Sequence, residues 1–519
     1  MIEIILLILS IILLYYVVIR PLNYWSKKNV QTGTVIPFFG DNFYVLLGRE
    51  SMTHMVERIY NKVQGVRFIG AYQFLTPMLF VKSPEVIKNI CVKDFDHFVN
   101  HRTFFPDDAD ELWSKNLISL KGQTWKDMRS TVSPTFTSSK MRAMYVLISQ
   151  KAELFVQYFL DKKEDFIKTE MKEAYRRYTA DVIASTAFGL EVNSLKDKDN
   201  EFYKMGTSIA NFSTFRKKLT FFMFQISHLL AKILGLALLT DNEKYFFMNL
   251  VKDTIEMREK QNIKRPDMLG ILMEAKNERA KAKSTDENKR KDEEGVIENV
   301  KQDLTVGDIT SQALIFFIAG FDAVSSQMCF IAYELAINPD VQKKLIEEID
   351  RNRPANSSPS YETLLNMSYL DQVILEAQRK WPIAVVADRV VTKPYTIEPE
   401  LPGEKPVHLE VGENIWIPIY AIHHDPNFYE NPDKFDPERF SPENKKNIDP
   451  YSYIPFGVGP RNCIGNRFAL LEIKAVFFHL LSHFEIVPVE ETNIPLRISK
   501  SAINLTSENN FPLGLKKRK

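Results

Sequence analysis

Cysteine is scarce in this chain, and its distribution excludes one class of protein. Only three cysteines occur among 519 residues, Cys91, Cys329 and Cys463. They lie far apart and form no C-x-x-C pair, so the sequence excludes a disulfide framework and favours a reducing compartment. An excess of charge is missing as well. The formal net charge of +1 at pH 7 gives no basis for nucleic-acid binding, and no internal repeat is visible.

A long apolar run opens the chain. Residues 4–19 are apolar apart from one serine, and Arg20 follows. A helix of that length spans about 24 Å, and Tyr24 and Trp25 extend it toward a membrane interface. A cleaved signal peptide is the alternative, but Glu3 precedes the run and no small-residue cleavage site follows it. We therefore predict a signal anchor that leaves the rest of the chain in the cytosol.

The remaining sequence predicts a mainly α-helical body with small β-sheets. Apolar content of 45%, including 36 phenylalanines, is ample for a large core. Residues 66–83 and 414–418 have strand-like patterns, whereas residues 107–350 show helical periods and few prolines. Residues 276–303 are dense in both charge signs, which predicts an exposed, mobile surface segment. The expected organisation is an anchor over 1–20, a linker over 21–45 and one catalytic domain over 46–519.

Ten residues near the C terminus carry the clearest chemical signal. Residues 456–465 follow the pattern F-x-x-G-x-R-x-C-x-G, which contains Phe456, Arg461, Cys463 and Gly465. Glycine keeps the backbone slim where it must approach a planar ring. Arginine offers a planar fork to a carboxylate, and an aromatic side chain keeps water from a metal-bound sulfur. The loop is therefore suited to present one thiolate to a heme iron.

This loop resembles the heme-ligand signature of the cytochrome P450 superfamily. The resemblance covers nearly the whole chain and is strongest to animal microsomal members, especially insect enzymes that oxidise foreign lipophiles. It implies the fold of that superfamily and heme b (iron protoporphyrin IX), with Cys463 as the axial iron ligand. The heme would lie between a distal helix and the helices on the cysteine side. A thiolate ligand favours O–O cleavage.

Three further motifs appear in the order that the resemblance implies. Glu376 and Arg379 match an E-x-x-R helix closed by Trp381-Pro382, and Arg439 belongs to a P-E-R-F segment. These three charges are expected to lock the scaffold around the heme loop, which is a structural role.

Two other positions resemble propionate ligands of the family. Trp125 and Arg129 match its W-x-x-x-R helix, where the four-residue spacing points both side chains at one heme propionate. Arg389 falls where many members place another propionate arginine. A plain surface charge is the alternative for each arginine.

The distal helix departs from the family pattern at one residue. Residues 315–330 resemble the signature A-G-x-[DE]-T-[TS], with Ala319, Gly320 and Asp322 in place but Ala323 where threonine is expected. The two small residues are expected to open a groove above the iron, and Asp322 to act as the acid of a proton relay. Ser326, the adjacent Ser325, an ordered water or a substrate hydroxyl can replace the missing hydroxyl. Otherwise proton delivery is poorer and more electrons are lost to peroxide.

The resemblance implies a monooxygenase that uses O2 and NADPH-derived electrons to oxidise lipophilic small molecules, xenobiotics in particular. Its partners would be NADPH–cytochrome P450 reductase, with cytochrome b5 as an optional second donor, and the endoplasmic reticulum membrane. The missing threonine keeps open a heme-thiolate isomerase or dehydratase that acts on a lipid peroxide without O2. A non-catalytic heme protein is a third alternative. Candidate pocket walls are Phe104, Phe105, residues 212–222, Phe316, Phe317, Phe321, residues 384–386 and residues 503–505.

Overall fold

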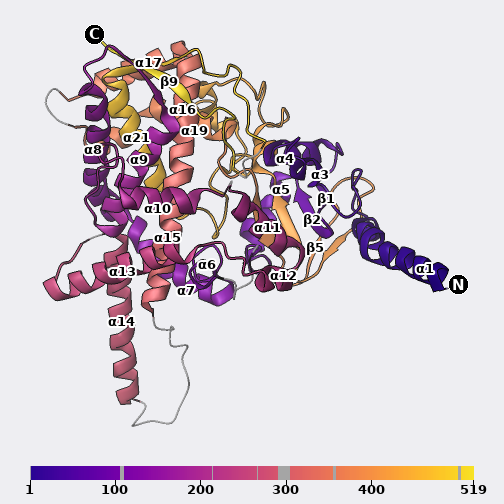
Figure 1. Cartoon of the computed structure of the whole chain (residues 1–519). Coiled ribbons are helices and arrows are strands. Elements are labelled where there is room, and N and C mark those ends of the chain that lie inside the picture. The colour runs from indigo at the N-terminus through magenta and orange to yellow at the C-terminus, as the bar shows by residue number, and fades with distance from the viewer. Residues whose placement is uncertain are drawn as a thin grey trace. The chain divides into compact units, whose positions relative to one another are not determined.

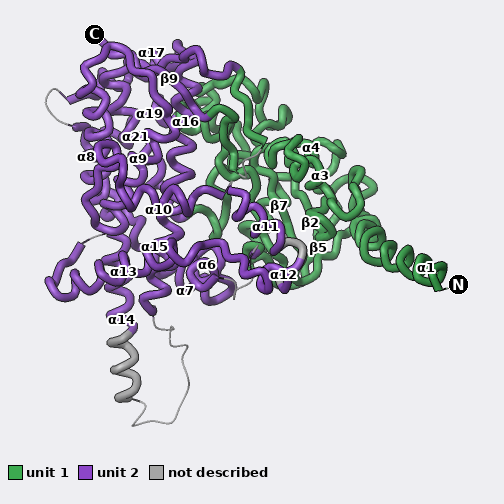
Figure 2. The backbone as a smooth tube through the Cα atoms, viewed as in Figure 1, with its two compact units in different colours: residues 1–102, 372–463, 495–509 green, residues 103–371, 464–494, 510–519 purple. Residues whose placement is uncertain are grey.

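The computed structural model describes residues 2–103, 105, 110–212, 214–265, 267–289, 304–354, 358–500 and 504–519. Its chain forms two compact units, coloured separately in Figure 2. Unit 1 holds residues 1–102, 372–463 and 495–509, and unit 2 holds residues 103–371, 464–494 and 510–519. Helices predominate in the chain, and the strands form small sheets (Figure 1). The predicted mainly α class with small sheets is confirmed.

The main sheet belongs to unit 1 and has the strand order β1-β2-β7-β4. β1 (Phe68–Gln73) and β2 (Thr76–Val81) form an antiparallel hairpin, which confirms the prediction for residues 66–83. β7 (Asn414–Ile417) lies parallel to β2 and antiparallel to β4 (Ala387–Val390). A second pair consists of β5 (Tyr395–Ile397) and β6 (Val407–Leu409). The main sheet thus joins the early and late segments of unit 1.

Short helices surround these strands in unit 1. They are α3 (Phe43–Leu46), α4 (Met52–Asn61), α5 (Pro84–Lys88), η3 (Asn89–Lys93), η4 (Phe95–His97), α20 (Ile419–His423), η8 (Pro437–Phe440) and η9 (Lys445–Asn447). The longer helix α19 (Ser368–Lys380) enters the unit at residue 372. It ends where Trp381 precedes Pro382, as a proline disfavours helical geometry at the residue before it.

The N-terminal helix is continuous over 26 residues. It comprises α1 (Ile2–Leu14), η1 (Tyr15–Ile19), η2 (Arg20–Asn23) and α2 (Tyr24–Lys27), and it is long and apolar enough to cross a membrane. No residue of α1 is buried. At its end, Trp25 is only 1% exposed and donates from Nε1 to the Ala71 carbonyl at 3.1 Å. Residues 21–45, predicted to be a linker, therefore begin with a segment packed against β1.

Unit 2 is mostly helical. Its helices are α6 (Glu111–Ser114), α7 (Gly122–Val132), η5 (Ser133–Phe136), α8 (Ser138–Leu160), α9 (Met171–Ile183), η6 (Ala184–Phe188), α10 (Glu201–Ala210), α11 (Phe215–Ile226), α12 (His228–Ile233), α13 (Asp241–Gln261), α14 (Met268–Lys289), α15 (Val306–Ile318), η7 (Ala319–Val324), α16 (Ser325–Ile337), α17 (Pro339–Asn352), α18 (Tyr361–Leu365) and α21 (Asn466–Leu481). α8 packs against both α9 and α21, and α9 packs against α16 (Figure 1). Most of the predicted helical region is confirmed.

Two segments of unit 2 can be compared with the sequence predictions: the charged segment and the distal helix. Helix α14 continues to Lys289, so the first part of the charged segment 276–303 is helical, and residues 290–303 lie outside the described residues. The distal helix begins at Thr305, whose side chain forms a reciprocal capping box with Asp308. It runs through α15, η7 and α16 and is mostly buried, as expected of a core helix.

A three-stranded sheet completes unit 2, with the order β3-β9-β8. β9 (Pro512–Lys517) is the central strand and pairs antiparallel with both β3 (Phe166–Glu170) and β8 (Phe484–Pro488). The last strand of the chain therefore connects its early and late helices.

The cysteine-bearing loop of unit 1 presses its backbone against η3. Gly459 has φ +78°, and a Cβ there would lie inside the van der Waals radius of the Cys91 carbonyl oxygen. Cys91 is itself fully buried. A side chain at position 459 therefore meets both backbone strain and a rigid neighbour.

We predict that Gly459→Ala destabilises unit 1 far more than Gly403→Ala. Gly403 has a similar φ of +82°, but nothing lies within 4 Å of the position of its Cβ. In the control, the free energy of unfolding should fall by about 1–2 kcal/mol, the strain of an alanine in the left-handed region. In Gly459→Ala it should fall by about 3 kcal/mol or more, because a buried backbone must also move. Urea unfolding of the two variants measures both losses. Equal losses would contradict the packing argument.

Candidate functional site

The cysteine loop is a compact turn closed by its own backbone. The Cys463 amide donates to the Phe456 carbonyl at 2.8 Å, and the Asn462 amide donates to the Gly459 carbonyl at 3.0 Å. Cys463 is exposed, although Ile454 and Arg461, which both precede it in the chain, are buried. The loop therefore presents one sulfur from a fixed backbone, which is what an axial ligand requires.

Two predicted arginines lie beside this loop in unit 1. The Arg461 Nε donates to the Val99 carbonyl at 2.8 Å. Arg389, on β4, is 2% exposed and donates from Nη2 to the Val458 carbonyl of the loop at 3.3 Å. Its Nε has no hydrogen-bond partner among the residues that the structure describes. A buried guanidinium N–H without a protein partner is a donor that an anionic group could accept from.

These features fit the heme that the motif predicts. A thiol donor is exposed in a rigid loop, and a buried arginine with an unused N–H adjoins the same loop. A heme offers an iron for the sulfur and propionates for guanidinium groups. Phe456 and Gly465 flank the cysteine in sequence, with Phe456 held by the carbonyl contact to the Cys463 amide. Cys463, Arg389 and Arg461 are the residues of unit 1 suited to hold the cofactor.

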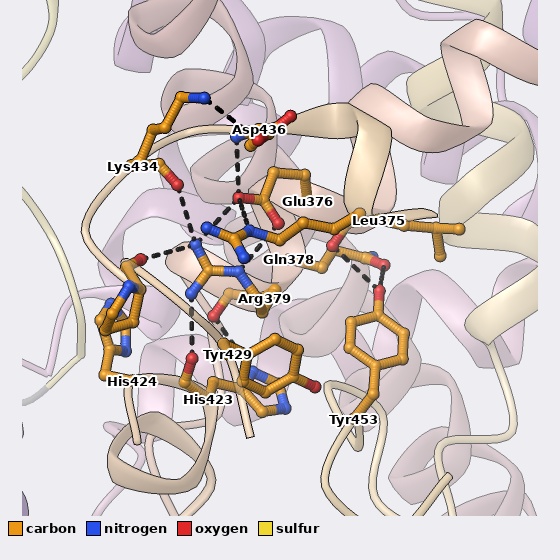
Figure 3. Close-up of polar contacts among 12 residues, drawn as sticks. Leu375, Glu376, Gln378, Arg379, His423, His424, Tyr429, Lys434, Asp436 and Tyr453 are labelled. Carbon is orange, nitrogen blue, oxygen red and sulfur yellow. Dashed lines mark hydrogen bonds and ion pairs between the residues drawn. The ribbon is translucent and has the colours of Figure 1, made fainter. Parts of the chain in front are cut away.

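The predicted E-x-x-R pair forms a fully buried ion pair on α19. The Arg379 Nε lies 2.8 Å from one Glu376 carboxylate oxygen, and its Nη2 lies 2.9 Å from the other; both side chains are 0% exposed. The remaining N–H groups of Arg379 donate to the carbonyls of His423 at 2.9 Å and Pro432 at 2.7 Å (Figure 3). The ion pair thereby fixes the segment around His423 and Pro432, which follows Arg379 by 44 and 53 residues.

The P-E-R-F segment joins the same network. The Asp436 amide donates to Glu376 at 2.9 Å (Figure 3). Arg439 places its Nε 3.5 Å from the same carboxylate and donates from Nη2 to the Asn431 carbonyl at 2.9 Å. Glu376, Arg379 and Arg439 are therefore brought together, as the sequence predicts.

The sequence analysis missed His423, which connects this network to the cysteine loop. Its Nδ1 lies 3.1 Å from the Arg379 carbonyl, and the Ile454 amide donates to its Nε2 at 3.0 Å. These partners assign the tautomer with the proton on Nδ1. The Tyr453 ring stacks on the imidazole (Figure 3). Burial lowers the pKa of His423 to about 3, so the ring is neutral at physiological pH. Only its adjacency to a second histidine marks it in the sequence.

The W-x-x-x-R residues lie in unit 2. α7 carries Trp125, which is 3% exposed, and Arg129, which is half-buried one turn later. Their spacing places both on one face of the helix. The structure confirms the helix but does not test the propionate contact, which stays a prediction.

The distal helix contains a π-helical bulge, η7, at the predicted signature. Asp322 lies in this bulge and is bound by two cations from α9. The Arg176 Nη2 lies 2.6 Å and the Lys172 Nζ 3.1 Å from the same carboxylate oxygen. Although burial opposes ionisation, these two cations lower the pKa of Asp322 to about 2. Asp322 is therefore a carboxylate at neutral pH and holds no proton of its own to donate.

The residues of the distal signature on either side of Asp322 differ in exposure and in their contacts. Ala319 is exposed, but a Cβ at Gly320 would lie 2.8 Å from the Ile183 side chain of α9. Gly320 thus permits close packing of α9, which differs from its predicted role of opening a groove. The Ser326 hydroxyl donates to the Asp322 carbonyl at 2.7 Å and also contacts the Lys172 Nζ. Ser326 is brought to Asp322, and Ala323 lies between them without a polar side chain.

A second residue missed by the sequence analysis is Glu472 on α21. It is fully buried, and neither carboxylate oxygen has a hydrogen-bond partner within the described part of the chain. Burial raises its pKa well above the ordinary value, because the low-dielectric interior favours the neutral form of the carboxyl group. In the sequence, this residue could have been noticed as a single acidic residue within the apolar run that forms α21.

The aromatic residues predicted as pocket walls fall into two groups. Phe317 and Phe321 are 0% exposed and stack on each other, so both are core residues. Phe105 instead joins a mixed cluster with Phe221 and Phe224 around α11 and α12. Phe104 and residues 501–503 lie outside the described residues.

We predict that His423 makes stability depend on pH. The unfolded side chain takes up a proton near pH 6.5, whereas the buried ring does so only near pH 3. Stability is therefore complete above pH 6.5 and is lost as the pH falls, by about 2 kcal/mol between pH 7 and pH 5. His423→Gln should remove this part of the slope, and His408→Gln, at an exposed histidine, should retain it. Urea unfolding at both pH values tests this, and parallel slopes for all three proteins would refute it.

Comparison with known proteins agrees with this geometry over nearly the full length. The family model described as "Cytochrome P450" matches residues 30–513. Cytochrome P450 9e2 of Blattella germanica is 42% identical, with 96% of this chain and 94% of that protein covered. Probable cytochrome P450 9f2 of Drosophila melanogaster is 39% identical, with 96% and 95% covered. Cytochrome P450 6k1 of Blattella germanica is 35% identical, with 96% and 94% covered. The chain belongs to the cytochrome P450 family and is similar to its insect members.

Proposed function

We propose that this protein is an NADPH-dependent monooxygenase that oxidises lipophilic small molecules, xenobiotics among them, at heme b ligated by Cys463. Family membership supports the broader class, a heme-iron monooxygenase. The observation that carries the proposal is the exposed thiol of Cys463 beside a buried Arg389 with an unused N–H. When bound, the heme supplies oxygen activation.

The protein's own residues would supply the setting for this chemistry. Cys463 would bind the iron, and Arg389 and Arg461 would hold propionates in unit 1. By the family resemblance, Trp125 and Arg129 of α7 would serve the same purpose. The ionised Asp322 and the hydroxyl of Ser326 would take part in proton transfer near the distal bulge, with Lys172 as their shared cation.

The partners and location follow from the same proposal. NADPH–cytochrome P450 reductase would deliver the electrons, with cytochrome b5 as an optional second donor. The apolar helix Ile2–Lys27 supports anchoring in a membrane. We propose the endoplasmic reticulum membrane, with the catalytic domain in the cytosol, because basic residues follow the apolar run.

A second candidate function rests on Ala323. A heme-thiolate isomerase or dehydratase that rearranges a lipid peroxide needs neither O2 nor external protons, so it can manage without a hydroxyl at this position. The oxygenase proposal remains ahead because Asp322 is present in the bulge and held in an ordered charge network.

Isotopic oxygen separates the two functions. We expect purified protein with reductase, NADPH and lipophilic substrates to incorporate one labelled oxygen atom from O2 into product. NADPH consumed, peroxide released and label in the product are measured together. Conversion of a lipid hydroperoxide without NADPH and without label would instead establish the rearranging enzyme.

The ligand assignment has its own test. Cys463→Ser should abolish the thiolate-type spectrum of the reduced protein with carbon monoxide, because a serine hydroxyl does not replace a thiolate on iron. Cys329→Ala is the matched control, since Cys329 is fully buried in α16. The control should keep the spectrum. A Cys463→Ser protein that retains both spectrum and turnover would remove Cys463 from the ligand role.

A further inference from the structure

The π-helical bulge η7 requires support that an ordinary helix does not. A π turn contains an additional residue, so its carbonyls are displaced from the usual hydrogen-bonding pattern. Such bulges are marginal unless surrounding groups bind them. In this chain η7 packs against α9 within unit 2, and Gly320 allows the close approach.

Side chains of α9 bind the backbone of the bulge directly. The Thr179 hydroxyl donates to the Phe321 carbonyl at 3.0 Å, and the Lys172 Nζ approaches the Asp322 carbonyl at 3.4 Å. Thr179 is completely buried and Lys172 nearly so. Two consecutive carbonyls of η7 are thus held by a neighbouring helix.

The same helix binds the side chain of the bulge. Arg176 contacts one Asp322 oxygen through both Nε at 3.2 Å and Nη2 at 2.6 Å, and Lys172 contacts the same oxygen at 3.1 Å. Loss of either cation would leave a partly buried carboxylate less well compensated, which is costly. Lys172 is the central group, because it also contacts the Ser326 hydroxyl at the start of α16.

Position 323 removes one internal contact that the bulge could otherwise have. In a helix, a threonine hydroxyl can bond to a carbonyl three or four residues earlier. A threonine at 323 would therefore be able to bind the carbonyl of Gly320 or Ala319 from inside the bulge. Ala323 cannot make that bond. Within the distal helix the Ser325 hydroxyl donates to the Phe321 carbonyl at 2.8 Å and the Ser326 hydroxyl to the Asp322 carbonyl at 2.7 Å, so the missing tie concerns the first residues of the bulge.

We propose that Lys172 and Arg176 are positioning residues that hold the distal bulge from α9, in place of the bond that Ala323 cannot make. The inference concerns the shape of η7, and its consequence for oxygen chemistry rests on the proposed monooxygenase function. Lys172, which is nearly buried, contacts the backbone and side chain of Asp322 together, and Arg176 reinforces the side-chain contact.

Hydrogen exchange tests the positioning without any turnover. In the full-length protein, Lys172→Met should speed amide exchange of peptides covering residues 319–324 by about tenfold or more, as expected for the loss of a charge-assisted contact. Lys151→Met is the matched control. Lys151 has the same 8% side-chain exposure and pairs with Glu191 at 3.0 Å, but it lies on α8. The control should leave these peptides unchanged.

A second variant keeps this test decisive. Arg176 is more exposed than Lys172, so Arg176→Met should fold even where Lys172→Met does not, and it should speed exchange in the same peptides. Unchanged exchange at residues 319–324 in Arg176→Met, or in a folded Lys172→Met protein, would overturn the proposal.

Rescue by threonine distinguishes positioning from a general structural role. Lys172→Met should raise the fraction of NADPH electrons released as hydrogen peroxide about threefold or more, and Ala323→Thr in the same chain should return it toward the wild-type value. Ala323→Thr alone should lower this fraction by a smaller factor than it does in Lys172→Met, because the wild-type bulge is already held from α9. Absence of rescue would overturn the proposal. Failure of the wild type to incorporate labelled O2 would refute the proposed function and leave the exchange result to decide the positioning role.

Discussion

The buried ion pair between Glu376 and Arg379 is the constraint on which the rest of unit 1 depends. Two charges without access to water are tolerated only when every hydrogen-bonding group finds a partner. Arg379 therefore determines the course of the loops at His423 and Pro432, and Glu376 determines that of the Asp436 segment. Through His423 the same constraint reaches the entry to the cysteine loop.

Unit 2 uses charge in a different way. Asp322 is partly buried in a distorted helix. Its two cationic partners come from α9, about 150 residues earlier in the chain. In unit 1 the paired charges belong to one helix turn and hold loops. In unit 2 the paired charges belong to two helices and hold an irregular turn. Both arrangements fix the backbone at a sequence motif that resembles one of the family.

The sequence predicts the parts of this protein whose chemistry is local. The cysteine loop, the E-x-x-R turn and the distal signature are each contained in a few residues, so their patterns are legible without coordinates. The roles of His423, Lys172 and Arg176 could not be predicted from the sequence, because their hydrogen-bond and ion-pair partners lie far away in the chain. The packing of Gly320 against Ile183 of α9 was also not predicted, since a sequence pattern does not say which helix packs on which face. A pocket role for Phe317 stays a prediction.

The N-terminal helix ends against the main sheet of unit 1. Its last turn is fixed by Trp25 in the unit and by the bond from the Tyr72 hydroxyl to the Leu22 carbonyl. The irregular segments η1 and η2 lie between this fixed turn and α1, so they determine how much of a tilt of α1 in a bilayer would reach the sheet. Bilayer thickness, which governs helix tilt, would then act on unit 1 through these two short segments.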